Sequence, residues 1–230
     1  EGGYDFYANS TAHGDPGYGI EGFLNIPIND RMAVRLVAWH EYQGGWIDNV
    51  YAERTYLASD ITINNAEIVE ENFNTAEATG LRALLKIDLS DNWTLTPGIT
   101  WQQGKTRGVW YDNPEYVGEY EVSRFFEDFN DEDWYQASLT LDGEIGDMNL
   151  VYAGAYLDRN VDSEYDYSGY AEYLEYYASS CYYENPPGTC VDPSQYVNGD
   201  EEFTRFSHEL RLQSSQAQRF RWIAGVFYQR

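Results

Sequence analysis

The 230-residue chain has no apolar run near the roughly 18 residues of a transmembrane helix, and its mean hydropathy is -0.61. Basic residues are scarce: 14 Lys and Arg stand against 39 Asp and Glu, a formal charge of -25. This imbalance argues against nucleic acid as a partner and against electrostatic binding to anionic lipid. No stretch has the charged start and apolar core of a signal peptide, and residue 1 is Glu. We expect a mature protein or a piece of one.

Motifs for catalysis and for metal binding are also missing. The sequence has no G-x-S-x-G, no paired nucleophile and base, and no phosphate-cradling glycine run. His13, His40 and His208 have no Cys or carboxylate at zinc spacing, so we interpret them as ordinary surface or lumen residues. Segment 128–133 (DFNDED) alternates oxygen ligands but lacks the glycine of a calcium loop, which favours a solvated acidic loop. We expect no enzyme, no cofactor and no metal site.

Aromatic residues are abundant, with 22 Tyr, 7 Trp and 10 Phe, which favours strands and interfacial surfaces. The clearest pattern is residues 79–103, TGLRALLKIDLSDNWTLTPGITWQQ. It predicts two strands of about ten residues, because apolar residues recur at every second position, joined by a turn at 90–92. The apolar faces comprise Leu81, Ala83, Leu85, Ile87 and Leu89 in the first strand, and Trp93, Leu95, Pro97, Ile99 and Trp101 in the second.

The two tryptophans of the second strand have an informative spacing. Trp93 and Trp101 share a face and lie about 26 Å apart along an extended strand. With a tilt of about 40°, roughly 20 Å of height separates their rings, close to the apolar band between the aromatic girdles of an outer-membrane barrel.

The alternating pattern recurs in seven further segments, which predicts nine strands in all. They are residues 2–12, 18–28, 31–40, 134–144, 148–157, 203–213 and 220–228. Connections alternate between short turns near 29, 90, 146 and 215 and long interruptions at 41–78, 105–133 and 158–202. The interruptions hold 28 of the 39 acidic residues but 5 of the 14 basic ones.

This alternation of short and long connections is typical of transmembrane barrels, with short periplasmic turns and long extracellular loops. We therefore predict an all-β fold: a transmembrane antiparallel up-and-down β-barrel. Nine such strands leave two unpaired edges, which hydrocarbon does not tolerate. Residues 1–230 are thus expected to be a partial barrel domain within a larger closed one, unless something unseen covers the edges.

Four segments resemble TonB-dependent outer-membrane receptors. Residues 22–49 (GFLNIPINDRMAVRLVAWHEYQGGWIDN) are similar to the family's early barrel, with its NxPixDxxAxR hairpin turn. Residues 79–96 look like its GxRxxL…TLT hairpin, residues 206–212 (FSHELRL) like its QELRL strand, and residues 221–230 (RWIAGVFYQR) like its WxxGxfY strand. Each motif is short, and the resemblance rests on their order and spacing along nearly the whole chain.

The resemblance implies a barrel of about 22 strands with an N-terminal plug, in the outer membrane of a bacterium. It also implies uptake of a scarce small-molecule or metal-chelate ligand, by default an iron-siderophore, driven by the TonB system. Outer-membrane lipid and lipopolysaccharide would be partners, and TonB would act through the plug and TonB box, which this chain lacks. Two alternatives stay open: an ungated porin-like channel, and a secreted soluble β-sandwich that binds glycans.

The long loops hold the candidate ligand-binding residues. The spacing of Tyr170, Tyr173 and Tyr177 predicts a short helix that presents rings for ligand capture. Trp46 in the first long loop and Trp110-Tyr111 in the second are expected at the same mouth. The alternative is that these rings pack loops together or line the membrane interface. The acidic surroundings favour a neutral or metal-bearing ligand over a free polyanion.

Polar strand faces are expected to line the lumen, and both signs of charge occur there: Arg31, Arg35, Arg82, Lys86, Arg205 and Arg211, with Asp88, Asp142 and Glu209. We interpret this as a charge-balanced, hydrated wall; the alternative is a path for an anionic ligand.

The two cysteines, Cys181 and Cys190, enclose a segment with Pro186-Pro187-Gly188, which favours chain reversal. A cell-surface setting predicts a disulfide between them. By the chain-entropy model it would contribute about 2.5–3 kcal/mol.

Overall fold

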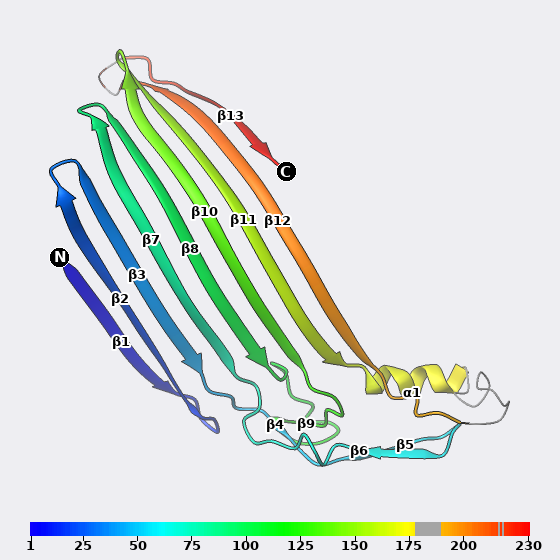
Figure 1. Ribbon diagram of the computed structural model, residues 1–230. Helices are drawn as coiled ribbons and strands as arrows, with labels where there is room; N and C mark the ends of the chain where they lie inside the picture. Colours follow the sequence, from blue (N-terminus) through cyan, green and yellow to red (C-terminus); the bar gives the residue numbers. More distant parts are fainter. Residues whose placement is uncertain (178–189, 216, 218) are drawn as a thin grey trace.

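The computed structural model describes residues 1–177, 190–215, 217 and 219–230, with side chains for all of these except 174–177. One antiparallel sheet dominates it, in the order β1-β2-β3-β7-β8-β10-β11-β12-β13. The strands run up and down beside one another as a curved wall (Figure 1), which confirms the prediction of nine strands. They are β1 (Gly2–Ser10), β2 (Pro16–Asn29), β3 (Met32–Gln43), β7 (Ala76–Ser90), β8 (Trp93–Arg107), β10 (Phe129–Ile145), β11 (Met148–Asp166), β12 (Tyr196–Ser214) and β13 (Ile223–Gln229).

Register fixes two chemically different faces of the sheet. On one face Ala83 pairs with Ile99, which pairs with Ala137 in turn. On the other face Arg82 pairs with Thr100. Because successive side chains of a strand point to opposite faces, these pairs extend the division over the whole sheet. The predicted separation into an apolar and a polar face is confirmed. We call them the apolar face (that of Ile99) and the polar face (that of Thr100).

A row of aromatic side chains, which we call the aromatic ring, marks the limit of the apolar face toward the long loops. Here and below, "above" means toward the long loops, which lie at the bottom of Figure 1. Between the short turns and this level, the described strand segments place no Asp, Glu, Lys or Arg on the apolar face. Neighbouring rings touch across strands, with centroids 5.7 Å apart for Tyr18 and Tyr42 and 4.6 Å apart for Tyr156 and Phe206. The indole of Trp101 donates to Asp133 at 2.8 Å. The aromatic ring comprises Tyr18, Tyr42, Trp101, Tyr135, Tyr156 and Phe206.

Above the aromatic ring the strands continue, and there the expected boundaries are wrong. Strand β10 begins at Phe129 rather than near 134, β11 runs to Asp166 rather than 157, and β12 begins at Tyr196 rather than 203. The face that is apolar below carries Asp131, Asp158 and Asp162 here. The alternation of apolar and polar residues ends where neither face of the sheet is apolar. The strands continue past that point, because hydrogen bonding between backbones does not require an apolar face.

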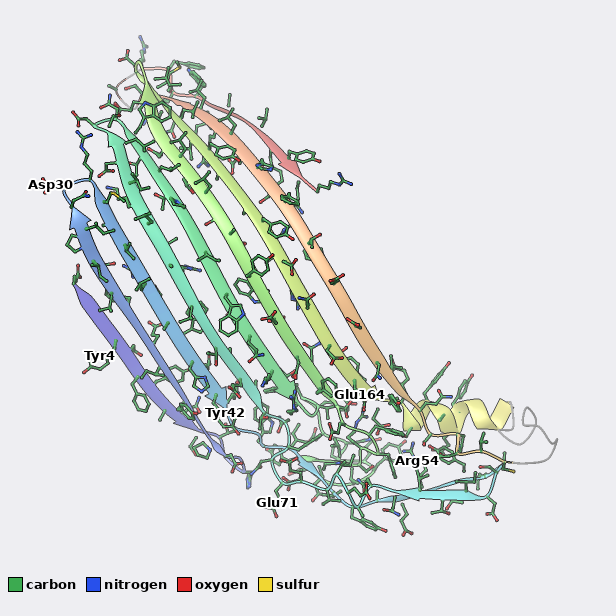
Figure 2. The ribbon with its side chains drawn as sticks, in the orientation of Figure 1. Tyr4, Asp30, Tyr42, Arg54, Glu71 and Glu164 are labelled. Atoms are coloured by element: carbon green, nitrogen blue, oxygen red, sulfur yellow. The ribbon has the colours of Figure 1, made fainter. Side chains whose placement is uncertain are left out.

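The two ends of the sheet differ sharply. Residues 30–31, 91–92, 146–147 and 215–222 connect strands at one end, and residues 11–15, 44–75, 108–128 and 167–195 connect them at the other. Figure 2 shows Asp30 at the first end, and Arg54 and Glu71 among the loops at the second. The loops contain β4 (Asp48–Asn49), β5 (Glu53–Tyr56), β6 (Ile61–Asn64), β9 (Glu121–Val122) and α1 (Ser168–Tyr177). Within the described residues, no helix has the length and apolarity needed to cross a membrane.

Candidate functional site

The first two long loops share a small hydrophobic core. Ile47 from loop 44–75 packs with Val109 and Val122 from loop 108–128, and all three are buried. Trp46 and Phe73 pack against this cluster, and β4 pairs in parallel with β9 beside it. Two segments far apart in sequence are thereby joined into one folded unit, which we call the loop cap.

Buried asparagines satisfy the backbone of the loop cap. The side-chain oxygen of Asn74 accepts hydrogen bonds from the N–H groups of Trp46 and Ile47, each at 2.7 Å. The Asn49 side chain donates to the carbonyl of Ile68 at 2.8 Å and accepts from the N–H of Arg124 at 2.7 Å. A buried backbone group without a partner is costly, so these amides fix irregular chain that has no sheet partner.

Arg124 connects the loop cap to the end of β11. Its Nε donates to Asp128 at 2.6 Å, and its Nη2 donates to Asp128 at 2.8 Å and to the carbonyl of Asp166 at 2.9 Å. Its Nη1 donates to the hydroxyl of Tyr111 at 3.3 Å. The two carboxylates are almost fully buried, and that of Asp166 also accepts from the N–H groups of Phe125 and Ser168.

Arg124 stays protonated in its buried position. Burial acts to lower its pKa, but the hydrogen bonds and charge of Asp128, together with the charge of Asp166, outweigh it and raise the pKa. The expected solvated acidic loop at 128–133 is therefore wrong. Asp128 is a buried ion-pair partner, and Phe129 begins strand β10. The acidic run by itself could not reveal this, because the cation that pairs with Asp128 is Arg124, which lies outside the run.

An aromatic cavity of about 800 Å³ lies between the loop cap and the start of α1. Five of its lining side chains are aromatic and about half-exposed, with exposed fractions from 43% to 56%. These cavity rings are Trp110, Tyr111, Tyr165, Tyr167 and Tyr170. Arg124, Asp128 and Asp166 also line the cavity.

The cavity brings together some of the predicted residues and leaves others beside it. Trp110, Tyr111 and Tyr170 line it. Trp46 packs its ring against that of Trp110, with centroids 4.9 Å apart at 70°, so it supports the wall from within the loop cap. Tyr173 stacks on Tyr170 at 6.1 Å and 26°.

Helix α1 confirms the helix predicted from the tyrosine spacing. The side chain of Tyr177, its last residue, lies outside the described residues. So does Cys181, and the disulfide to Cys190 stays a prediction.

Sequence reasoning did not select Tyr165, Tyr167 or Arg124 for the site. The tyrosines belong to the same dense run as Tyr170, and this run was the available signal. Arg124 gave no local signal, because its contact with Asp166 joins loop 108–128 to the distant end of β11.

The polar face below the cavity carries paired charges. Lys86 lies 3.2 Å from Asp88, and Arg211 lies 3.6 Å from Glu209. Arg82 donates to the hydroxyl of Thr100 at 3.2 Å. Exposed pairs of this kind contribute little stability, but they neutralise the wall. The arrangement agrees with a charge-balanced surface.

The three histidines have ordinary aromatic and hydroxyl neighbours. His13 stacks on Tyr120 with ring centroids 5.5 Å apart. His40 bonds Thr79 at 2.8 Å, and His208 bonds the hydroxyl of Tyr152 at 2.8 Å, both on the apolar face.

Comparisons with known proteins give one distant likeness to report. No family model matches the chain, and no curated protein matches it. Among solved structures, the outer membrane transporter YddB from Escherichia coli aligns with 93% of this chain at 10% identity and a TM-score of 0.47. The chain spans 27% of the length of that protein. A likeness this remote assigns no function.

Proposed function

We propose that this chain forms part of the wall and the outer loops of an active-transport receptor in a bacterial outer membrane. It captures a scarce small molecule or metal chelate, and an iron-siderophore complex is the default ligand of the TonB-dependent receptors that it resembles. The observation that carries the proposal is the cavity of half-exposed aromatic rings, held by a folded loop cap at one end of a sheet with an uncharged apolar face.

The apolar face supports membrane insertion rather than a soluble sandwich. Leu24, Leu81 and Ile99 are each about half-exposed. The aromatic ring bounds this face above, and acidic residues follow immediately beyond it. This sequence of apolar band, aromatic girdle and polar wall is the pattern of an outer-membrane barrel in lipid. Outer-membrane lipid and lipopolysaccharide are then the natural contacts of the apolar face.

The loop cap supports a receptor rather than an ungated channel. An ungated channel requires an unobstructed, water-filled entrance. The loops here instead fold around their own core and present an aromatic cavity. Rigid rings on a fixed scaffold suit ligand capture, because little conformational entropy is lost on binding. Energy from the TonB system would enter through regions outside this chain.

Uptake in cells that express the full-length protein tests the proposal. We expect import of a labelled ferric trihydroxamate complex to require both the TonB system and Trp110. The Trp110→Ala variant is compared with Tyr116→Ala, which removes a ring that is 83% exposed and lies outside the cavity lining. Import that persists without the TonB system would favour a porin-like channel, and a protein that stays soluble without detergent would exclude both membrane functions.

A further inference from the structure

We propose that the aromatic cavity recognises a positively charged group on its ligand, such as the ammonium group of an organic cation or of a metal chelate. The inference rests on the proposed function and narrows the ligand class of the same site.

Fixed charge in the cavity lining is negative on balance. One cation, Arg124, faces two carboxylates, Asp128 and Asp166, and no other Lys, Arg, Asp or Glu belongs to the described lining. Both carboxylates are bound within the protein, so their charge is fixed in place rather than free to pair with the ligand.

Arg124 is a poor receptor for an anion, because its guanidinium already binds groups of the protein. Its Nε and both Nη groups already donate to Asp128, to the Asp166 carbonyl and to Tyr111. Its side chain is only 18% exposed. An incoming carboxylate that took over the Nε and Nη2 donors would have to displace Asp128 and leave it buried without its partner, which is strongly unfavourable. The Nη1 group is engaged by Tyr111 and belongs to a cation whose charge the two carboxylates already offset. Among the described lining residues, no cation is therefore free to pair with an anionic ligand.

The cavity rings supply attraction of the opposite sign. The face of an aromatic ring carries negative potential and attracts an ammonium group, most strongly where water is excluded. Tyr167 and Tyr170 meet edge to face, with centroids 6.2 Å apart at 80°, and so present differently directed surfaces at one wall. Trp110 and Tyr111 stand in the same lining, on the loop cap.

The wider field acts in the same direction. The chain carries a formal charge of -25, and 28 of its 39 carboxylates lie in residues 41–78, 105–133 and 158–202, which comprise the long loops and the strand ends beside them. Such a field raises the local concentration of cations and lowers that of anions around the loops. Long-range steering and the cavity rings thus favour the same ligand charge.

A matched pair of probes tests this on the detergent-solubilised full-length protein. The first is a linear ferric trihydroxamate complex that bears a terminal ammonium group. The second is the same complex with that amine acetylated, so that size and metal coordination are kept and the charge is removed. We expect calorimetry to give at least tenfold tighter binding for the ammonium form, with the difference shrinking at high salt.

Ring variants separate attraction by the aromatic face from hydroxyl hydrogen bonding. Tyr170→Phe keeps the ring and should retain the preference for the ammonium form, whereas Tyr170→Leu should reduce it several-fold. Tyr116→Leu serves as the control outside the cavity. Equal affinity for the two complexes, or tighter binding of the acetylated form, overturns the inference and leaves the proposed function standing. Binding of neither complex overturns both.

Discussion

Trp46 and Trp110 meet edge to face, with ring centroids 4.9 Å apart, although strands β7 and β8 separate them in the chain. One ring belongs to the loop core and the other to the cavity wall. The contact therefore joins the core of the loop cap to the wall of the aromatic cavity, where we propose that a ligand binds.

Loss of Trp46 should weaken binding at a cavity that this residue does not line. An aromatic pair of this geometry contributes about 0.5–1.5 kcal/mol beyond area burial. We expect Trp46→Ala to lower affinity for the ammonium-bearing complex about threefold to tenfold by calorimetry. Unchanged affinity, with Tyr116→Ala as reference, would show that the Trp110 ring needs no support from Trp46.

Replacement of Arg124 should open the loop cap. Arg124→Met keeps much of the side-chain volume but leaves Asp128 and Asp166 buried without a cation, a change that costs about 3–5 kcal/mol in buried pairs. Hydrogen exchange of the amides in 108–128 should accelerate, while that of the β7–β8 ladder stays slow. Arg124→Lys keeps the charge and should give an intermediate rate. Slow exchange throughout 108–128 in Arg124→Met would contradict the structural role.

Alkaline pH should loosen the contact between the β5–β6 hairpin and α1. The hydroxyl of Tyr56 donates to the carbonyl of Ser168 at 3.4 Å, and burial raises the pKa of Tyr56 above the ordinary 10.0. A raised pKa means that the neutral form stabilises the fold. This contribution is complete below 10.0 and is lost as the pH rises through the higher folded value.

Ultraviolet absorbance titration measures this effect against Tyr56→Phe, which removes the ionising hydroxyl. The late-ionising part of the titration should be larger by one phenol in the parent protein than in Tyr56→Phe. A late component of the same size in Tyr56→Phe would show that Tyr56 does not contribute to it.

The boundary at the aromatic ring predicts that a charge introduced on the outward face of β8 costs more free energy below the ring than above it. Ile99 and Gln103 both point outward from β8, below and above Trp101. Ile99→Arg should cost about 2–4 kcal/mol on insertion into lipid vesicles, and Gln103→Arg about 0–1 kcal/mol. Leu85→Arg should resemble Ile99→Arg. Similar costs at 99 and 103 would remove the membrane assignment of this face.

Strand order and facing were predictable because alternation is a local property that burial of one face enforces. Ile99 and Thr100 face opposite ways whatever lies elsewhere in the chain. The strand ends were not predictable, because Asp131 and Asp158 occupy ladder positions where water reaches both faces. The helix at Tyr170 followed from spacing, since a helical period leaves its trace in a few residues.

The loop cap could not be predicted from local sequence patterns. Asn74 binds the backbone of a segment 27–28 residues away, and Arg124 reaches Asp166, 42 residues away. Nothing beside them in the sequence distinguishes them from other polar loop residues. The pairing of Arg124 with Asp128 has helical spacing by number, but the segment that holds it is not helical. Its buried position depends on Asp166, at the end of β11.

The continuation of β11 beyond the aromatic ring sets the electrical surroundings of ligand capture. From Tyr156 to Asp166 the strand rises about 33 Å along its axis, or roughly 25 Å of height at a tilt near 40°. Ionic screening at physiological salt acts over about 8 Å. In the proposed membrane orientation, the cavity stands about three screening lengths beyond the aromatic ring, so the charge of lipids at that level is largely screened there. We therefore expect the affinity of the cavity for the ammonium-bearing complex to be the same in neutral and in anionic bilayers.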